Sequence, residues 1–398
     1  MIESKIHRLL IVSHVVHYQY QGKLYAYGPY AREIELWADL FPKVVIASPL
    51  HKELPAGDCI PFTHQNISIS PQPERGGTGL KEKFYQVISI PFMTYTLSCS
   101  MHNADAIHIR CPGNIGLLGI ILAPLFSHYR IAKYAGQWND YPGESFSTKL
   151  QKSLLKSRWW GAPVTVYGSW PNQPNHIVPF FTSVMTDDQM TLAQATAAKK
   201  KMHHPLRILF VGRLSKSKNV DALLKAVHGI KNSGIDSHCR IIGDGPEQTS
   251  LIHLTHELNL EHEVEFDGGL PFEQVLPAYT WADILVLASE TEGWPKAITE
   301  GMAFGLVCIG SKRGLVPQIL GDGRGILVEP GDENQLKDAL IEISHSELEY
   351  KRISQKAAAW SQTYTMTNLR KSLRELLIQR WGLTDEDLLQ LPSIEKTS

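Results

Sequence analysis

The chain has 398 residues and a formal net charge of −1, with 43% hydrophobic and 20% charged residues. This length is sufficient for two domains with separate cores, and the composition is that of an ordinary soluble globular protein. The near-zero net charge excludes a general electrostatic attraction to nucleic acid. The five cysteines are scattered without a Cys-x2-Cys pair, which excludes a disulfide framework and indicates a reducing compartment. The first residues lead into an apolar segment without a signal-peptide pattern, so we expect a cytoplasmic protein.

Apolar segments with strand character alternate with helical patterns along the N-terminal half. We expect strands at residues 7–13, 44–48, 106–110, 130–135 and 164–167. Residues 30–40 have helical spacing, and the apolar run 115–126 predicts a buried helix that is too short to span a bilayer. The polar, aromatic stretch between Tyr18 and Pro29 predicts a loop. The alternation predicts a parallel sheet with right-handed crossovers.

The same alternation restarts after residue 205, with expected strands at residues 207–213, 239–242, 264–266, 282–289, 306–310 and 326–328. We therefore predict an α/β protein with two doubly wound parallel-sheet (Rossmann-like) domains facing across a cleft. The predicted boundaries are an N-terminal domain at 1–192, a linker at 193–205, a C-terminal domain at 206–365, and a helix and tail at 366–398 that pack back on the N-terminal domain.

Two carboxylates separated by seven residues follow the apolar segment 282–289. We expect Glu292 on the strand-to-helix loop and Glu300 about two turns into the following helix. A loop that leads into a helix N-terminus presents free backbone N–H groups, which suit a phosphate, and a carboxylate can accept hydrogen bonds from two sugar hydroxyls. The pattern indicates a nucleotide-sugar site. The alternative is that both carboxylates are solvated surface charges.

Basic residues follow the first strand of the C-terminal half. Gly212, Arg213 and Lys218 are expected on a strand-to-helix loop, where a forked guanidinium and a point charge suit a diphosphate. Ordinary surface basic residues are the alternative. Gly245 lies in a turn whose glycines permit close backbone approach, either to support that loop or to contact the same ligand.

Gly-Arg-Leu-x3-Lys at 212–218, Gly-x-Gly-Pro at 243–246 and Glu-x7-Glu at 292–300 together resemble the motifs of retaining glycosyltransferases of family 4, which have the GT-B fold. The resemblance extends over residues 207–381 and is weaker from 1 to 190. It implies that the basic loop residues bind the donor diphosphate, that Glu300 holds the ribose hydroxyls and that Glu292 lies near the transferred sugar.

The resemblance has two further implications for donor binding. The stretch Gly293, Trp294, Pro295 and Lys296 is expected to supply backbone N–H groups to sugar hydroxyls or phosphate. Gly28 is expected in an N-terminal glycine loop at the diphosphate. For the Trp294 side chain, stacking on a sugar and packing in the protein both remain open.

The sequence departs from the family pattern at Arg110. The segment 105–110 resembles the family's Asp-x2-His-x-His strand end, with Arg110 in place of the second histidine and His108 on the same side of the strand. A guanidinium cannot act as a general base, so we expect an electrostatic role at the cleft edge, on the leaving phosphate or on an acidic acceptor. The alternative is a structural ion pair with Asp105 or Glu144.

The resemblance implies an enzyme that moves a sugar from a nucleotide-diphospho-sugar to a hydroxyl of a glycan or lipid-linked acceptor with retention of configuration. Its catalytic residues would be Arg213, Lys218, Glu292 and Arg110, and no metal or other cofactor is expected because the fixed cations take that place. By analogy the pathway is the synthesis of a cell-surface polysaccharide or glycolipid in a bacterial cytoplasm. A nucleotide-sugar epimerase of the same fold and a non-catalytic sugar-binding module are the alternatives.

One segment of the N-terminal half suggests a peripheral membrane contact. Residues 149–160 carry Lys149, Lys152, Lys156 and Arg158, with leucines at helical spacing and a tryptophan pair that ends at Trp160. Such a helix suits an anionic membrane surface. An ordinary amphipathic helix packed against its own domain is the alternative.

Overall fold

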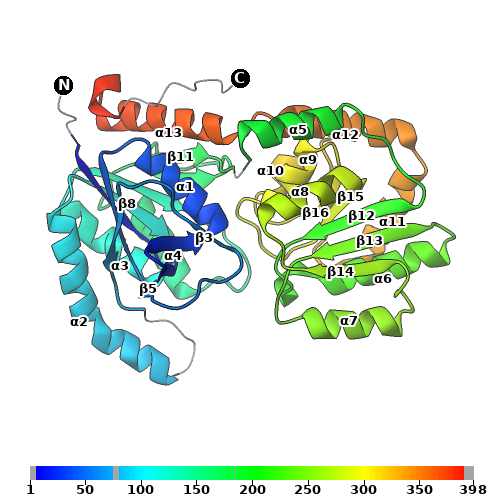
Figure 1. Cartoon of the computed structure of the whole chain (residues 1–398), viewed down its shortest axis with the longest axis horizontal. Coiled ribbons are helices and arrows are strands. Elements are labelled where there is room, and N and C mark those ends of the chain that lie inside the picture. The colour runs from blue at the N-terminus through cyan, green and yellow to red at the C-terminus, as the bar shows by residue number, and fades with distance from the viewer. Residues whose placement is uncertain (1–5, 75–79, 184, 390–398) are drawn as a thin grey trace. The chain divides into compact units, whose positions relative to one another are not determined.

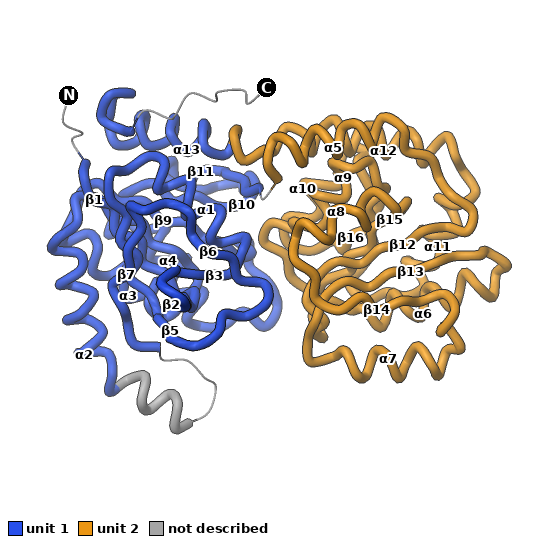
Figure 2. The backbone as a smooth tube through the Cα atoms, in the orientation of Figure 1, with its two compact units in different colours: residues 1–184, 369–398 blue, residues 185–368 orange. Residues whose placement is uncertain are grey.

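The computed structural model describes residues 6–74, 80–183 and 185–389, and the side chains of 80–87 lie outside this description. The chain forms two compact units (Figures 1 and 2): unit 1 comprises residues 1–184 and 369–398, and unit 2 comprises residues 185–368. These boundaries differ from those expected from the sequence. The segment 193–205, expected as a linker, begins inside helix α5 (Asp187–Ala197), which belongs to unit 2.

Unit 1 is built on a parallel sheet with the strand order β11-β10-β9-β8-β1-β4-β7. Its strands are β1 (Arg8–Val12), β4 (Lys43–Ser48), β7 (Ile67–Pro71), β8 (Ala106–Cys111), β9 (Tyr129–Tyr134), β10 (Val164–Tyr167) and β11 (Ile177–Phe180). The central strands are apolar on both sides because helices cover both faces of the sheet. The chain order reverses between β1 and β8, which makes this pair the switch point of the sheet.

Helices form a layer on each face of this sheet. One core joins α1 (Gly28–Ala38) and α13 (Met366–Trp381) to one set of strand residues, including Leu9 and Ile11. The other core joins α2 (Leu80–His102), α3 (Asn114–Leu122), the short helix η1 (Ala123–Leu125) and α4 (Phe146–Lys156) to the alternate residues, including Leu10 and Val12. The two-residue period of the strands thus divides unit 1 into two apolar layers.

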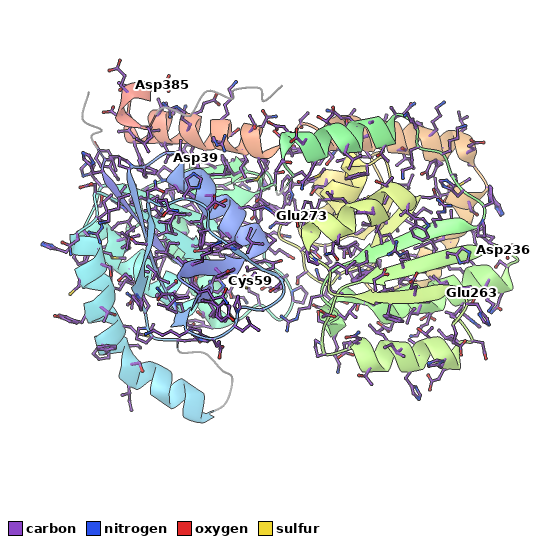
Figure 3. The ribbon with its side chains drawn as sticks, in the orientation of Figure 1. Asp39, Cys59, Asp236, Glu263, Glu273 and Asp385 are labelled. Carbon is purple, nitrogen blue, oxygen red and sulfur yellow. The ribbon has the colours of Figure 1, made fainter. Side chains whose placement is uncertain are left out.

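The C-terminal helix α13 contributes to the core of unit 1 from residue 369 onward. Leu373, Leu377 and Trp381 are buried there. Two carboxylates labelled in Figure 3 form ion pairs with this helix: Asp39 with Arg370 at 2.7 Å, and Asp385 with Arg374 at 2.9 Å. The apolar contacts and the ion pairs together attach the end of the chain to its first half.

A small sheet takes the place of the loop predicted between Tyr18 and Pro29, so that prediction is wrong. Its strands, in the order β5-β2-β3-β6, are β5 (Leu50–His51), β2 (His17–Tyr20), β3 (Lys23–Tyr27) and β6 (Cys59–Pro61). Strands β2 and β3 pair antiparallel around Gln21 and Gly22, whose φ angles are 48° and 74°. Positive φ at both central residues is what a tight two-residue hairpin turn requires.

Unit 2 is built on a second parallel sheet, with the order β14-β13-β12-β15-β16-β17. Its strands are β12 (Leu206–Val211), β13 (Ser237–Ile242), β14 (Val264–Gly268), β15 (Ile284–Leu287), β16 (Val307–Ser311) and β17 (Ile326–Val328). The order reverses between β12 and β15. The prediction of an α/β protein with two doubly wound, Rossmann-like sheets is confirmed.

Helices also cover both faces of the sheet in unit 2. Figure 1 shows α6 and α7 on one side and α8, α9 and α10 on the other. Besides α5, the helices are the short η2 (Lys216–Lys218), α6 (Val220–Asn232), α7 (Gln248–Glu257), α8 (Phe272–Trp281), α9 (Lys296–Ala303), α10 (Val316–Leu320), α11 (Glu333–Ser344) and α12 (Glu347–Ser361).

Candidate functional site

The loops after β12 and β15 meet at the switch point of unit 2. Lys218, on the first loop, places its Nζ 2.5 Å from Oε1 of Glu292, on the second, although the two residues are 74 positions apart in the chain. The Glu290 N–H donates to the Ser217 carbonyl at 2.8 Å, and the Asn219 side-chain amide donates to the Ala288 carbonyl at 2.8 Å. Three links therefore fix these loops to each other at the point where doubly wound sheets bind their ligands.

Arg213 begins the loop after β12 and has an exposed side chain. Among the described residues its guanidinium has no hydrogen bond or ion pair. Lys218 differs, since it is partly buried and its charge is already matched by Glu292. An uncommitted guanidinium beside a neutral Lys–Glu pair leaves a net positive charge at this sheet edge, which suits an anionic ligand.

Glycines of the neighbouring loop hold the Arg213 loop in place. A Cβ atom on Gly245 would lie 2.1 Å from the Leu214 carbonyl oxygen, and one on Gly243 would lie 1.9 Å from that of Gly212. The Leu214 N–H donates to the Asp244 carbonyl at 2.8 Å. Only glycine permits these backbone approaches. The structure therefore gives Gly245 the supporting role that the sequence analysis left open beside direct contact.

Glu300 is buried on α9, which begins at Lys296, so it lies about one turn into the helix and not the predicted two turns. Its Oε2 accepts a hydrogen bond of 2.6 Å from the hydroxyl of Tyr279, a fully buried residue of α8. Burial and then the nearby Glu300 carboxylate hold the pKa of Tyr279 well above its ordinary value, so the hydroxyl stays protonated and donates. This hydrogen bond fixes the orientation of the Glu300 carboxylate.

The residues that lead into α9 differ in the groups they can offer to a ligand. The helix begins at Lys296, and its N-cap residue, Pro295, makes no side-chain capping hydrogen bond. Pro295 has no N–H, so the expectation that the whole stretch from Gly293 to Lys296 donates N–H groups is wrong at that position. Trp294 donates to Thr299 Oγ1 at 3.2 Å and packs edge-on against Tyr364, which favours packing over sugar stacking.

Arg110 lies at the switch point of unit 1, and it is buried. Its Nη1 is 2.6 Å from Glu33 Oε1, and Lys133 Nζ is 2.9 Å from Glu33 Oε2, so one buried carboxylate joins two buried cations. The guanidinium also lies 4.9 Å from the centre of the Tyr30 ring. The expected exposure at a cleft edge is therefore wrong, while a net charge of about +1 remains in this buried cluster of Glu33, Arg110 and Lys133.

The ion-pair partners proposed for Arg110 are also wrong, because both are engaged elsewhere. Asp105 Oδ2 accepts the backbone N–H groups of His7 and Arg8 at 2.9 and 2.8 Å. Glu144 pairs with Lys152. The actual partner, Glu33, comes from α1, which covers the same face of the sheet.

His108 lies on the same face as Arg110, as the strand period predicts. Its ring is fully buried and stacks on Trp37 with ring centroids 4.3 Å apart. Burial, and then the charge of Arg110, lower the pKa of His108 to about 3, so the ring is neutral at working pH. The packing indicates a core residue.

Gly28 is the first residue of α1, and its backbone N–H is already used. It donates to the Asp58 carbonyl at 2.9 Å, and a Cβ on Gly28 would lie 3.2 Å from the same oxygen. Gly28 thus has a structural reason to be a glycine. The contact of its loop with the diphosphate remains a prediction. Because the Gly28 N–H is already bonded, another N–H group of that loop would have to bind the ligand.

Sequence reasoning missed Glu33, Lys133, Asn219 and Tyr279. The pairing of β8 with β9 aligns Lys133 with Arg110, so the predicted strands, taken as neighbours, carried a signal for Lys133. Tyr279 and Glu33 belong to helices whose orientation is set by tertiary packing, and they gave no local signal.

Part of the chain matches a known family. Residues 194–360 match the family model described as "Glycosyl transferases group 1", and the matched region includes Arg213, Lys218, Glu292 and Glu300. The matched region covers most of unit 2.

Curated relatives match over a similar region. The chain is 28% identical over 151 residues to N-acetyl-alpha-D-glucosaminyl L-malate synthase of Bacillus anthracis, which covers 38% of the chain and 39% of that protein. It is 31% identical over 147 residues to the putative colanic acid biosynthesis glycosyltransferase WcaL of Escherichia coli (strain K12), with 35% and 36% covered. The matches span less than two-fifths of these relatives.

Solved structures match nearly the whole chain. Sucrose-phosphate synthase from Thermosynechococcus elongatus superposes with a TM-score of 0.70 at 16% identity, covering 95% of this chain and all of that one (100%). Anabaena Alr3699/HepE in complex with UDP-glucose gives a TM-score of 0.65 at 14% identity, covering 94% and 99%. These likenesses show the fold, and the predicted GT-B fold is confirmed.

Proposed function

We propose that the protein is a glycosyltransferase that moves a sugar from a nucleotide-diphospho-sugar to a hydroxyl of a glycan or lipid-linked acceptor with retention of configuration, as in family 4. The observation that carries this proposal is the Lys218–Glu292 pair at the switch point of unit 2. It joins the two loops on which a basic diphosphate motif and a carboxylate motif were predicted independently. The match to the group 1 family model over the same residues supports it.

The donor roles follow from charge and geometry. Arg213 is uncommitted and exposed, so it binds the diphosphate directly, and Lys218 adds a second cation whose position Glu292 fixes. Glu300, oriented by Tyr279, accepts the ribose hydroxyls. Glu292 and the N-terminus of α9 face the transferred sugar and its phosphate.

In the proposed reaction the bond between the anomeric carbon and the diphosphate oxygen breaks, and the acceptor hydroxyl oxygen forms a new bond to that carbon on the same face of the sugar. The hydroxyl proton passes to the leaving diphosphate. Negative charge grows on the leaving group, and cations fixed in advance stabilise that charge without reorganising. Arg213 and Lys218 supply these cations, so we propose that the enzyme needs no metal ion. Turnover that is unchanged by a chelator fits this part of the proposal.

The proposed pathway is cell-surface polysaccharide or glycolipid synthesis in a bacterial cytoplasm. The name of the E. coli relative, a putative colanic acid biosynthesis glycosyltransferase, supports this class of product. The structure of HepE with UDP-glucose makes UDP-sugars the first donors to test.

A panel of UDP-, GDP- and ADP-sugars tests the proposed activity. The true donor is expected to stabilise the protein by about 2.7 kcal/mol at a hundredfold excess over Kd, because it binds only the folded state. The thermal shift identifies the donor, and product analysis with and without a glycan acceptor identifies the reaction. Sugar conversion without any acceptor would indicate an epimerase, and tight binding without turnover would indicate a sugar-binding module.

Substitutions of Glu300 and Glu292 are expected to have different effects on ligand binding. Glu300→Gln should weaken both the free nucleoside diphosphate and the full donor by roughly 10–100-fold, as for the loss of charge-assisted hydrogen bonds. Glu292→Gln should weaken the sugar-bearing donor more than the free nucleoside diphosphate, which it affects only through the loss of the Lys218 ion pair. Calorimetry with both ligands measures the difference, and Glu342→Gln, which alters an exposed carboxylate of α11 outside the site loops, is the control. The reverse ranking would reject this division of roles.

A further inference from the structure

The outer surface of helices α2, α3 and α4 in unit 1 is unusually apolar. These helices bury one side against the sheet, where Met93, Met101, Ile120 and Leu155 belong to a single core. Helix α3 contacts both α2 and α4, so the three form a continuous layer. The residues on the solvent side of this layer define what we call the α2–α4 face.

The described part of α2 is apolar on its solvent side as well as on its buried side. Ile88, Phe92 and Tyr95 follow one another at intervals of four and three residues, which places them on one stripe of the helix. They are 58%, 60% and 68% exposed. Met93, Leu97 and Met101 form the buried stripe on the opposite side. Core packing therefore does not explain the outer stripe.

The apolar surface continues across the neighbouring helices. The large apolar side chains exposed on α3 and η1 are Ile121 and Leu125. Phe146, which is 80% exposed, is the first residue of α4, and the exposed Trp159 lies three residues after that helix ends. Scattered single apolar residues need no explanation, but a set of large exposed apolar side chains carried by three adjacent helices indicates a binding surface.

The charges on this face have one sign. Residues 88–102, 114–126 and 146–160 contain no aspartate or glutamate, whereas Lys149 and Arg158 are exposed and Lys156 is partly exposed. His102 and His128 are exposed at its margin. A second copy of the chain would bring these like charges together, and a purely apolar partner would leave them unmatched. An anionic surface matches both the apolar residues and the cations.

We propose that the α2–α4 face docks the protein on a lipid bilayer that contains anionic lipids. Phe92, Tyr95, Leu125, Phe146 and Trp159 enter the boundary between headgroups and acyl chains, and Lys149 and Arg158 meet the lipid phosphates. Docking is peripheral, since among the described residues no helix is both long and apolar enough to cross a membrane. The proposal does not depend on the proposed glycosyl transfer.

The structure changes which residues of the segment 149–160 serve this contact. Lys152 is buried and pairs with Glu144, and Trp160 is buried in the core, so neither reaches lipid. Lys156 lies 5.1 Å from the centre of the Trp138 ring and is only partly exposed. The contact therefore extends from the exposed part of α4 across α3 to α2.

Sedimentation of the full chain with vesicles tests the proposal. We expect binding to vesicles of phosphatidylcholine mixed with phosphatidylglycerol, little binding to phosphatidylcholine alone, and release by salt. Phe92→Ser combined with Tyr95→Ser should weaken vesicle binding by about tenfold or more, because both rings lose their apolar insertion. Lys149→Gln combined with Arg158→Gln should weaken binding to the anionic vesicles alone.

Matched control variants distinguish binding through the α2–α4 face from nonspecific hydrophobic adsorption and from nonspecific electrostatic attraction. Leu192→Ser combined with Leu348→Ser removes two exposed apolar side chains of unit 2, and Lys351→Gln combined with Lys371→Gln removes two exposed charges outside the face. Both controls should bind vesicles like the unaltered chain. Circular dichroism and melting establish that each variant is folded.

Three results would overturn the proposal. They are no vesicle binding by the unaltered chain, equal loss in the face and control variants, or a concentration-dependent dimer that only the Phe92→Ser, Tyr95→Ser variant abolishes. The last result would assign the face to a second copy of the chain.

Discussion

Replacing Arg213 with alanine is expected to lower kcat/KM by about 10²–10³, or ~3–4 kcal/mol, as for the loss of one group that stabilises charge in the transition state. Arg213 is exposed and, among the described residues, has no side-chain partner, so the same change should leave the melting temperature nearly unchanged. Steady-state kinetics with the donor found by thermal shift, together with melting of the same preparation, measures both effects.

Two variants of the same loop sharpen this test. Lys216→Ala removes an exposed cation three residues away and should retain most of the activity. Arg213→Lys keeps the positive charge but loses the forked pair of donors, so its kcat/KM should lie between those of Arg213→Ala and Lys216→Ala. If a folded Arg213→Ala enzyme turns over at nearly the normal rate, the diphosphate role of Arg213 is lost.

The two sheets were predictable because their strands are covered on both faces. Such strands are continuous apolar runs, and the segments predicted at 44–48, 106–110 and 164–167 each agree with a strand of the structure to within a residue. The hairpin of β2 and β3 was missed because its tyrosines were attributed to a polar loop. Tyrosines in alternate positions on both sides of Gln21 and Gly22 were the available signal.

The candidate site was predictable in part, because its residues follow strands whose carboxyl ends meet at one edge. That rule brings the loops of Lys218 and Glu292 together, but it does not show that the two side chains pair with each other. The same limit explains the error at Arg110. Its partner Glu33 is 77 residues away on a helix, and the rotation of that helix is set by tertiary packing.

Glu33→Gln is expected to destabilise unit 1 by about 3–5 kcal/mol, because it leaves two buried cations without their shared carboxylate. Burial alone would raise the pKa of Glu33, but the charges of Arg110 and Lys133 outweigh it and hold that pKa well below its ordinary value. The carboxylate therefore contributes stability above its unfolded pKa of about 4.3, and this contribution is lost as the pH falls below that value. Urea denaturation at several pH values measures it, with Glu375→Gln, an exposed carboxylate of α13, as the control.

The roles of Arg110 and Glu33 can be distinguished by the net charge that each substitution leaves in the buried cluster. Arg110→Gln leaves Glu33 with Lys133 as a neutral buried pair, so it should cost clearly less stability than Glu33→Gln.

The turnover of the folded Arg110→Gln variant then shows whether Arg110 takes part in the reaction. The catalytic assignment predicted from the sequence gives Arg110 an electrostatic role on the leaving phosphate or on an acidic acceptor. On that assignment the kcat of Arg110→Gln should fall by about tenfold or more because the fixed positive charge is lost, and Arg110→Lys should recover only part of the rate because the forked donor is missing. A double-mutant cycle between Glu33 and Arg110 measures their coupling in stability and in turnover separately. Strong coupling in stability with full turnover in both Arg110 variants would make the cluster structural and end the catalytic assignment of Arg110.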